Sequence, residues 1–505
     1  MNSDNSESEL PPPPSAAEEA AARRELKRAA ASGVQWSFVG TVVNQIGRLL
    51  FALALARIVG PDDFGIVQQA TIYMLFMSLM LDQGFGTALI QRRSLDSDSV
   101  RTVSSLNLVM TVVLVVTTLL VAPLMADLFH TPELAGVLRV LTLSIIIEGL
   151  SVVPIAIVNR QLRFKALSAI QSVSVLVGGT IGIISALAGA RYWAIVTQSL
   201  VIDGLTLIGL LKLTGLPGVS RSFSRLREML RFSSFQFGSQ VLSFLGSNLD
   251  NVLVAERLDP RQLAFYAISY RFLTMPVQLL GSVVNRVALP IFARAQDDLA
   301  TVRSWFIAAT RLAGVVLFPA FTLLLVGAPD GIPLVFGDKW QPAVVPLQVL
   351  AIAGFSRGIR LLLPPLCQAL GRTDLNFGWS LVSLAVAVPG FLIGLHWGIR
   401  GVAVSVAVTS TLLGIGHLRL VGRLIGITQL DVARVMGPLV GCSAILAATW
   451  IATRTGLDTV GTPRLVTVLA ASLAGSLAYV GAVYWLAPKT SAAVQQMIGL
   501  MRRRA

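Results

Sequence analysis

The chain has 505 residues, of which 54% are hydrophobic and only 13% are charged, and its formal net charge is +14. A soluble globular domain is about 25% charged, so this composition excludes a large water-soluble domain and indicates a protein embedded in a lipid bilayer. The basic residues are dispersed in short loops between apolar spans, which is typical of membrane topology and argues against a nucleic-acid partner.

The N-terminal segment is acidic, then proline-rich, then basic, and it lacks the apolar core of a signal peptide. We predict that residues 1–33 form a disordered cytoplasmic extension, with a basic surface helix next to the first span. Fourteen apolar windows follow, so we predict an all-α integral membrane protein. The predicted membrane helices begin near residues 34, 66, 104, 138, 167, 191, 232, 263, 304, 341, 376, 401, 433 and 465.

The distribution of positive charge predicts the topology. With fourteen spans, both termini lie on the same side of the membrane. The termini and the loops on that side hold 25 of the 40 Lys and Arg, the opposite loops hold 9, and 6 lie within spans. Because cytoplasmic loops are enriched in Lys and Arg, we predict that both termini are cytoplasmic.

The two halves of the chain resemble each other. ALARIVGPDDFGIVQQA around Pro61 resembles LVAERLDPRQLAFYAIS around Pro260, at an offset of 199, and LAGARYWAI near Trp193 resembles HWGIRGVAV near Gly401. Because both halves begin at the cytoplasm, the repeat is parallel, with its axis along the membrane normal. We predict two six-helix lobes around a central cavity that opens to either side, which is typical of an alternating-access transporter.

The longest loop between spans is basic, contains Gly and Pro, and lies near the middle of the chain, which indicates a linker between the halves. We therefore predict an N-lobe over residues 34–213 (helices 1–6), a basic cytoplasmic linker over 214–231 and a C-lobe over 232–424 (helices 7–12). Helices 13 and 14 occupy 425–488, and a basic cytoplasmic tail occupies 489–505.

Several arginines lie inside the predicted spans, where each costs about 2.5–3.5 kcal/mol at a helix centre and is expected to face protein or water. Arg48 lies within helix 1, and Arg357 and Arg360 lie three residues apart on one face of helix 10. If both helices border the cavity, these three form a cationic patch whose guanidinium groups match a diphosphate. The alternative is internal salt bridges. Snorkelling to the lipid headgroups is a further alternative for the remaining embedded arginines, Arg271, Arg286 and Arg311.

Four acids also lie within the predicted spans: Asp82, Glu148, Asp203 and Asp250. A carboxylate in a low-dielectric interior can bind a proton or Na⁺ in one state and release it in another, so these acids are candidates for ion coupling. The alternative is that they neutralise embedded arginines. Asp82, in LDQGFG, has a further alternative role in bracing the glycine-rich break that follows it.

The sequence contains no catalytic, metal or cofactor pattern. The three histidines are scattered, and Cys367 and Cys442 lie in apolar segments without metal-ligand spacing. No Gly-rich phosphate loop precedes a Lys-Ser/Thr pair. We therefore expect neither an enzyme nor a bound cofactor.

Five stretches resemble the polysaccharide-export branch of the Wzx-type oligosaccharide flippases: ARIVGPDDFGIVQQA, DQGFGTALIQRR, NRQLRFKALS, ARYWAIV and FGDKWQPAVVPLQVL. These flippases belong to the larger group that includes lipid II flippases and multidrug antiporters. The resemblance covers residues 36–424, with the motifs in the family's order. Some motif positions have an architectural character, as span-end turns, close packing points or an interfacial aromatic anchor. They are Pro61, Gly65, Gly84, Gly86 and Trp340.

The resemblance implies two six-helix lobes around a cavity and a substrate, a glycan on a polyprenyl diphosphate, that is moved to the outer leaflet of the bacterial plasma membrane. Membrane lipid and the lipid-linked glycan are then partners. Two questions stay open: whether glycosyltransferases or a polymerase of the same pathway bind the protein, and whether it is a monomer. Three alternatives also remain: a multidrug antiporter, a membrane polymerase of lipid-linked glycans, and a non-transporting member of a synthesis complex. The embedded arginines outnumber the embedded acids 6 to 4, which argues against cationic drugs, and the short outer loops argue against an enzyme.

Overall fold

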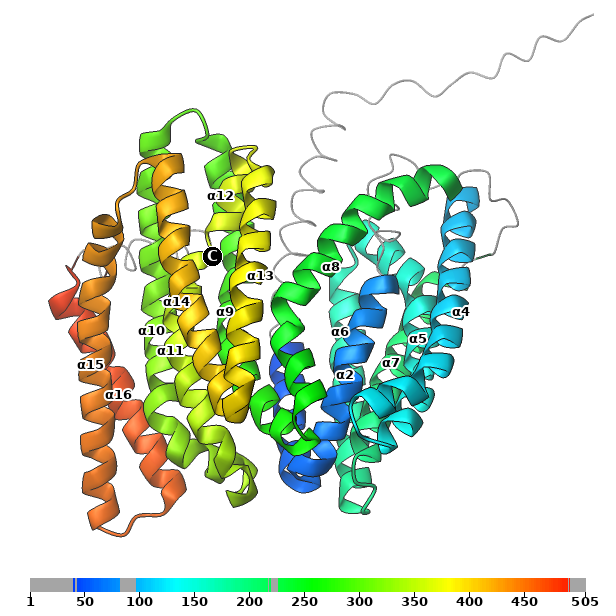
Figure 1. Ribbon diagram of the computed structural model, residues 1–505, viewed down its shortest axis with the longest axis horizontal. Helices are drawn as coiled ribbons and strands as arrows, with labels where there is room; N and C mark the ends of the chain where they lie inside the picture. The colour runs from blue at the N-terminus through cyan, green and yellow to red at the C-terminus, as the bar shows by residue number, and fades with distance from the viewer. Residues whose placement is uncertain are drawn as a thin grey trace, which may run out of the picture.

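The structure is a computed structural model that describes residues 40, 43–81, 97–216, 218, 226–488 and 490. Its long helices form two groups that lie side by side (Figure 1). The described helices are a first helix over residues 43–59, α2 (Pro61–Leu81), α4 (Ser97–Leu128), α5 (Glu133–Arg160), α6 (Phe164–Leu187), α7 (Trp193–Thr214), α8 (Leu226–Arg257), α9 (Pro260–Arg294), α10 (Leu299–Phe336), η1 (Asp338–Ala343), α11 (Val344–Arg360), α12 (Leu363–Ala369), α13 (Thr373–Gly394), η2 (Leu395–Trp397), α14 (Gly398–Ile425), α15 (Gln429–Thr459) and α16 (Arg464–Leu486).

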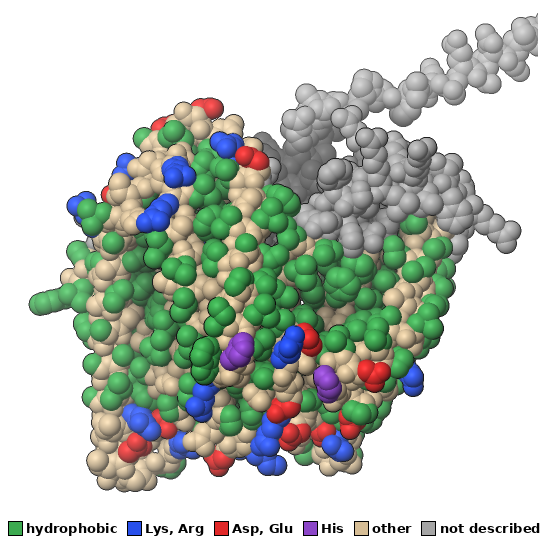
Figure 2. Space-filling view, viewed as in Figure 1, with side chains coloured by type: hydrophobic (Ala, Val, Ile, Leu, Met, Phe, Trp, Pro, Cys, Tyr) green, Lys and Arg blue, Asp and Glu red, His purple; other side chains and the backbone are tan. Residues whose placement is uncertain are grey.

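The prediction of an all-α membrane protein is confirmed. Each of the fourteen predicted spans overlaps one long helix, with α11 and α12 together as the tenth. Ten stretches of the described residues are long and apolar enough to cross a membrane, and one of them runs over both α13 and α14. The space-filling view shows a broad hydrophobic surface with charged side chains gathered mostly toward its two ends (Figure 2). This pattern is expected for a protein whose middle faces lipid.

The helices form two lobes around a central cavity, as predicted. The first helix, α2 and α4–α7 form one lobe, and α9–α14 form the other. Between them, α8 contacts α2 on one side and α9, α13 and α14 on the other. The exact boundaries of the lobes and of the linker stay predictions.

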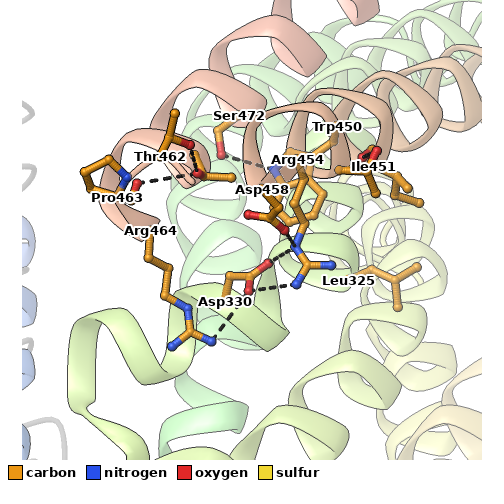
Figure 3. Close-up of polar contacts among 12 residues, drawn as sticks. Leu325, Asp330, Trp450, Ile451, Arg454, Asp458, Thr462, Pro463, Arg464 and Ser472 are labelled. Carbon is orange, nitrogen blue, oxygen red and sulfur yellow. Dashed lines mark hydrogen bonds and ion pairs between the residues drawn. The ribbon is translucent and has the colours of Figure 1, made fainter. Parts of the chain in front are cut away.

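The C-terminal pair, α15 and α16, packs on α10 at the outer edge of the second lobe (Figure 1). Asp330 of α10 holds this junction together, because it accepts from Nη2 of Arg454 at 3.0 Å and lies 3.6 Å from Nη2 of Arg464 (Figure 3). Nε of Arg454 also lies 3.7 Å from Asp458. We call these four residues the Asp330 cluster. Each of its arginines has a carboxylate partner from a neighbouring turn or helix.

The two lobes are joined where α2 and α9 begin. Gly65 lies directly against the backbone of Pro260, and a Cβ atom on Gly65 would come within 1.9 Å of the Pro260 carbonyl oxygen. A residue with a side chain would therefore separate the two helices here. Arg57, at the end of the first helix, donates from Nη1 to the carbonyl oxygens of Leu334 at 2.6 Å and Val335 at 3.1 Å, at the end of α10.

Trp340 of η1 strengthens the same junction. Its side chain is 1% exposed and its indole N–H donates to the carbonyl oxygen of Ala56 at 3.2 Å. The prediction that Trp340 is an interfacial anchor is therefore wrong, since the indole is enclosed by protein from both lobes. The rings that contact it, with centroids 5.4–5.7 Å away, are those of Phe64, Phe265 and Phe336.

Candidate functional site

A cavity of about 1120 Å³ lies between the lobes. Residues from the first helix, α2, α5 and α7 line it on one side, and residues from α8, α9 and α11–α14 line it on the other. The two helices on which the predicted cationic patch depends, helices 1 and 10, therefore both border the cavity. Among the described residues, its charged lining consists of four arginines and two acids: Arg48, Arg271, Arg357, Arg360, Glu148 and Asp203.

Arg48 lies on the N-lobe side of the cavity. Its Nε donates to Oδ1 of Asn44, one turn earlier on the same helix, at 3.0 Å. Glu148 of α5 and Asp203 of α7 are close enough for their charges to act on Arg48. Neither acid forms an ion pair with Arg48. Among the described residues, no N–O distance of 4.0 Å or less joins Arg48 to a carboxylate. The guanidinium is therefore attracted by two carboxylates but bound by neither.

Each of these two acids is held by a serine from a neighbouring helix. The hydroxyl of Ser78 donates to Oε2 of Glu148 at 2.5 Å, and that of Ser144 donates to Oδ2 of Asp203 at 2.8 Å. Each bond occupies one carboxylate oxygen. The other oxygen of each group remains for a ligand in the cavity, whether a proton, a cation or a substrate hydroxyl.

Arg357 is held by an aromatic residue instead of an acid. Its Nη1 and Nη2 both donate to the hydroxyl oxygen of Tyr270 at 3.4 Å, and its guanidinium carbon lies 5.3 Å from the centroid of that ring. The Tyr270 hydroxyl in turn donates to the carbonyl oxygen of Ser247 at 3.2 Å. Among the described residues, Nε of Arg357 has no hydrogen-bond partner. Arg360 lines the cavity one turn further along, so two cations face the same space with no carboxylate between them.

The other two predicted acids are placed differently. Asp250 is 2% exposed and accepts from the Tyr266 hydroxyl at 2.7 Å and from the Asn251 amide at 2.9 Å, and it does not line the cavity. It braces the layer behind Tyr270, since the rings of Tyr266 and Tyr270 are 5.8 Å apart. Asp82 lies outside the described residues.

Snorkelling to the lipid headgroups was one alternative for Arg271, and the structure does not support it. Arg271 follows Tyr270 on α9 and lines the cavity, because α9 turns its polar face inward against α8 and α11. Arg311 of α10 does not line the cavity, and its snorkelling stays a prediction. The side chain of Arg286 lies outside the described residues.

The arrangement favours an anion. Four arginines and two acids give the lining an excess of two positive charges, and both acids lie on the N-lobe side. Guanidinium groups bind phosphate oxygens through paired hydrogen bonds, and an unsatisfied guanidinium N–H is available for this at Arg357. Among the described residues, no three His, Cys, Asp or Glu side chains lie close enough together to hold a metal ion.

Several residues that position these charges were not predicted from the sequence. Ser78 and Ser144 orient the acids, and Tyr270 orients Arg357. The role of Tyr270 did have a signal in the sequence. Tyr270 and Arg271 are consecutive and interrupt an otherwise apolar stretch of the predicted span that begins near residue 263, which is α9 in the structure. The serines give no such signal because short hydroxyl side chains are common in membrane helices.

A sequence profile of the family described as polysaccharide biosynthesis protein matches residues 54–345. The chain belongs to this family. The match covers the end of the first helix and the whole of α2, α4–α10 and η1, so it includes the cavity-lining helices α2, α5 and α7–α9. Membership confirms the resemblance to the Wzx-type proteins noted from the five motifs.

Individual relatives agree with the family. The chain is 26% identical over 376 residues to the lipopolysaccharide biosynthesis protein WzxC of Escherichia coli, which covers 73% of this chain and 76% of the relative. It is 29% identical over 355 residues to the teichuronic acid biosynthesis protein TuaB of Bacillus subtilis, covering 69% and 73%. In fold, it resembles the lipid II flippase MurJ in an inward closed conformation, with a TM-score of 0.70, 14% identity and coverage of 88% and 97%.

Proposed function

We propose that this protein is a flippase that moves a polyprenyl-diphosphate-linked oligosaccharide across the bacterial plasma membrane, for synthesis of a cell-surface polysaccharide. The observation that carries the proposal is the cavity itself, in which Arg48, Arg271, Arg357 and Arg360 face one space and none has an ion-pair partner among the described residues. A diphosphate supplies the negative charge that this lining lacks. The family relatives act in polysaccharide biosynthesis, which is the process that needs such a carrier.

Three arginines on the C-lobe side are the proposed diphosphate site. Tyr270 fixes the guanidinium of Arg357, so binding costs little side-chain entropy, and Arg360 and Arg271 approach the same anion from the next turn and from α9. A hydrogen bond to a charged group contributes about 1.5–3 kcal/mol. Arg48 adds a fourth cation from the N-lobe, so the anion is held by both lobes. No bond is made or broken, and the protein acts as a transporter.

The direction of translocation follows from which end of the two lobes is joined. If the N-terminus is cytoplasmic, the first helix carries the chain to the outer side, where Trp340, Arg57 and Gly65 hold the lobes together. The cavity then receives the glycan and diphosphate from the inner leaflet, while the polyprenyl tail stays in lipid. Rocking of the lobes separates this junction and exposes the head group outside.

Ion coupling is assigned to Glu148 and Asp203. Both line the cavity beside Arg48, and each has one oxygen that its serine leaves free. A proton or cation on these acids removes their attraction for Arg48 and releases the guanidinium toward the diphosphate. Asp250 is a weaker candidate because its carboxylate is already occupied by Tyr266 and Asn251. Enzymes of the same pathway are the proposed protein partners, with the flippase itself a monomer.

The test is the sidedness of lipid-linked oligosaccharide in cells depleted of the protein, measured with a membrane-impermeant glycosidase on spheroplasts. We expect the lipid to accumulate on the inner face, with transport restored by wild type and by Arg400→Ala but not by Arg48→Ala or Arg357→Ala/Arg360→Ala. Arg400 is an exposed arginine outside the cavity, so it controls for loss of a positive charge. Accumulation of unpolymerised units on the outer face would contradict the proposal and indicate a polymerisation role.

A further inference from the structure

A row of uncharged polar and aromatic side chains lines the C-lobe side of the cavity, apart from the arginines. The row lies on α13, which stands at the inner edge of the C-lobe beside α8 (Figure 1). Its members recur at positions i, i+3, i+4 and i+7 and so share one face of the helix. They are Asn376, Trp379, Ser380 and Ser383, and all line the cavity.

Beyond its first turn, the rest of α13 is apolar. On the opposite face, Phe377, Leu381 and Val382 are between 45% and 53% exposed, as expected for side chains that contact lipid. Polar side chains in a membrane helix are costly unless they face a partner or a hydrated cavity. The polar face of α13 therefore faces the cavity, although the Ser380 hydroxyl donates to the carbonyl oxygen of Asn376 in the same helix at 3.0 Å.

His417 of α14 completes this row. Its side chain is 1% exposed and lines the cavity, yet among the described residues neither of its ring nitrogens has a hydrogen-bond partner. A buried polar group left without a partner costs stability, so the position favours a ligand that supplies the missing bonds. The charge of Arg360 acts on His417, which places the row next to the proposed diphosphate site.

Trp379 is positioned by a glycine. A Cβ atom on Gly416 would come within 2.6 Å of Cη2 of Trp379, so the absence of a side chain there lets the indole lie against α14. The indole also meets His417 edge-on, with the ring centroids 6.2 Å apart. The ring is thus held between α13 and α14 while part of it still lines the cavity.

These groups have the chemistry that binds a sugar. Asn, Ser and neutral His each both donate and accept hydrogen bonds, which suits hydroxyl groups, and an indole face suits the apolar C–H face of a sugar ring. The row carries no charge, so it is suited neither to a second phosphate nor to a cationic drug. In a lipid-linked oligosaccharide the first sugar is bonded directly to the diphosphate, so the space beside a diphosphate site has to accommodate that sugar.

We propose that Trp379, His417, Asn376 and Ser383 form a subsite for the sugar attached to the diphosphate. This inference rests on the proposed function, because it takes its orientation from the diphosphate bound at Arg357 and Arg360. The subsite makes the flippase selective for the first sugar, whatever the length of the glycan beyond that sugar.

The test compares two kinds of probe on purified protein in lipid nanodiscs. One is farnesyl diphosphate, and the other is farnesyl diphosphate that carries glucose, galactose or N-acetylglucosamine. We expect wild type to bind at least one sugar-bearing probe about 10-fold more tightly than farnesyl diphosphate. Trp379→Leu and His417→Leu should abolish this gain and leave the affinity for farnesyl diphosphate within about 2-fold, whereas Arg357→Gln should weaken both probes alike.

Matched variants separate a sugar contact from a folding defect. Trp485→Leu removes an indole that is 89% exposed and outside the cavity, and should change neither affinity. Ser383→Ala removes one hydroxyl with little risk to the fold and should lower the sugar-dependent gain about 3-fold. If Trp379→Leu weakens both probes equally, or if no sugar raises the affinity of wild type, the subsite is overturned. If wild type binds neither probe and Arg357→Gln changes nothing, the proposed function itself fails.

Discussion

Two regions of the molecule hold arginines in opposite ways. In the Asp330 cluster, Arg454 and Arg464 share the carboxylate of Asp330, whose side chain is 8% exposed. In the cavity, Arg357 contacts only the hydroxyl and the ring of Tyr270, and none of the four lining arginines has an ion-pair partner among the described residues. The first region neutralises its charges internally and the second does not.

The difference identifies which arginines are structural. An ion pair between helices neutralises charge permanently and fixes their packing, as Asp330 does for α10, α15 and α16. Cations without a carboxylate are costly unless water or a ligand solvates them, so four of them around one cavity indicate an anion that arrives and leaves. Among the described residues, Arg454 and Arg464 form such ion pairs, whereas Arg48, Arg357 and Arg360, for which internal salt bridges were the alternative, form none.

The largest expected effect comes from removing two cavity cations. Arg357→Gln/Arg360→Gln should weaken farnesyl diphosphate binding about 100-fold, since each guanidinium gives at least one charge-assisted hydrogen bond. The unfolding temperature should stay the same or rise slightly, because two like charges that repel each other have been removed. Calorimetric titration and thermal unfolding in detergent measure the two quantities. An unfolding temperature that falls with unchanged affinity would show that these arginines are structural too.

The sequence predicted the helices and the lobes well, because hydropathy is a local property and the repeat fixes their relation. It also placed Arg357 and Arg360 together, since a spacing of three puts both on one face of any helix. The inward orientation of Arg271 was missed because the rotation of α9 is set by its packing against α8 and α11. Sequence alone gives no measure of that rotation.

The four acids show the same limit. Glu148 and Asp203 reach the cavity, whereas Asp250 turns toward Tyr266, a residue sixteen positions later on the next helix. Glu148 and Asp203 lie in apolar stretches and Asp250 in a more polar one, but none of these neighbourhoods says which carboxylate faces the cavity, and only the tertiary contacts distinguish them. Trp340 was misjudged for a related reason, because an aromatic residue near a span end has the same local signature whether it contacts headgroups or, as here, the opposite lobe.

A smaller effect is expected in the Asp330 cluster, and it should appear in stability instead of binding. Asp330→Asn leaves Arg454 and Arg464 facing a neutral group, and should lower the free energy of unfolding by roughly 1–3 kcal/mol. Affinity for farnesyl diphosphate should not change, because the cluster does not line the cavity. The measurement is thermal unfolding beside calorimetric titration, with Asp458→Asn as a milder variant, since Asp458 contacts Arg454 only at 3.7 Å. If Asp330→Asn abolished binding of farnesyl diphosphate and left stability unchanged, the Asp330 cluster would be the binding region and its assignment as structural would be wrong.

The smallest effect is expected where the arginine of an ion pair faces solvent. Arg191 donates to both oxygens of Asp63, at 2.8 and 3.0 Å, but its side chain is 70% exposed. The hydrogen bonds from Arg191 to Asp63 raise the pKa of the arginine further above physiological pH. A raised pKa on a base contributes stability at every pH below its ordinary value and loses it only in strong alkali. Arg191→Gln should therefore lower the unfolding temperature by no more than about 1 °C, and equally at pH 5 and pH 9. Water screens the exposed guanidinium, so a loss as large as that of Asp330→Asn would mean that the burial of Asp63, whose side chain is 10% exposed, and not the exposure of Arg191, decides what this ion pair contributes.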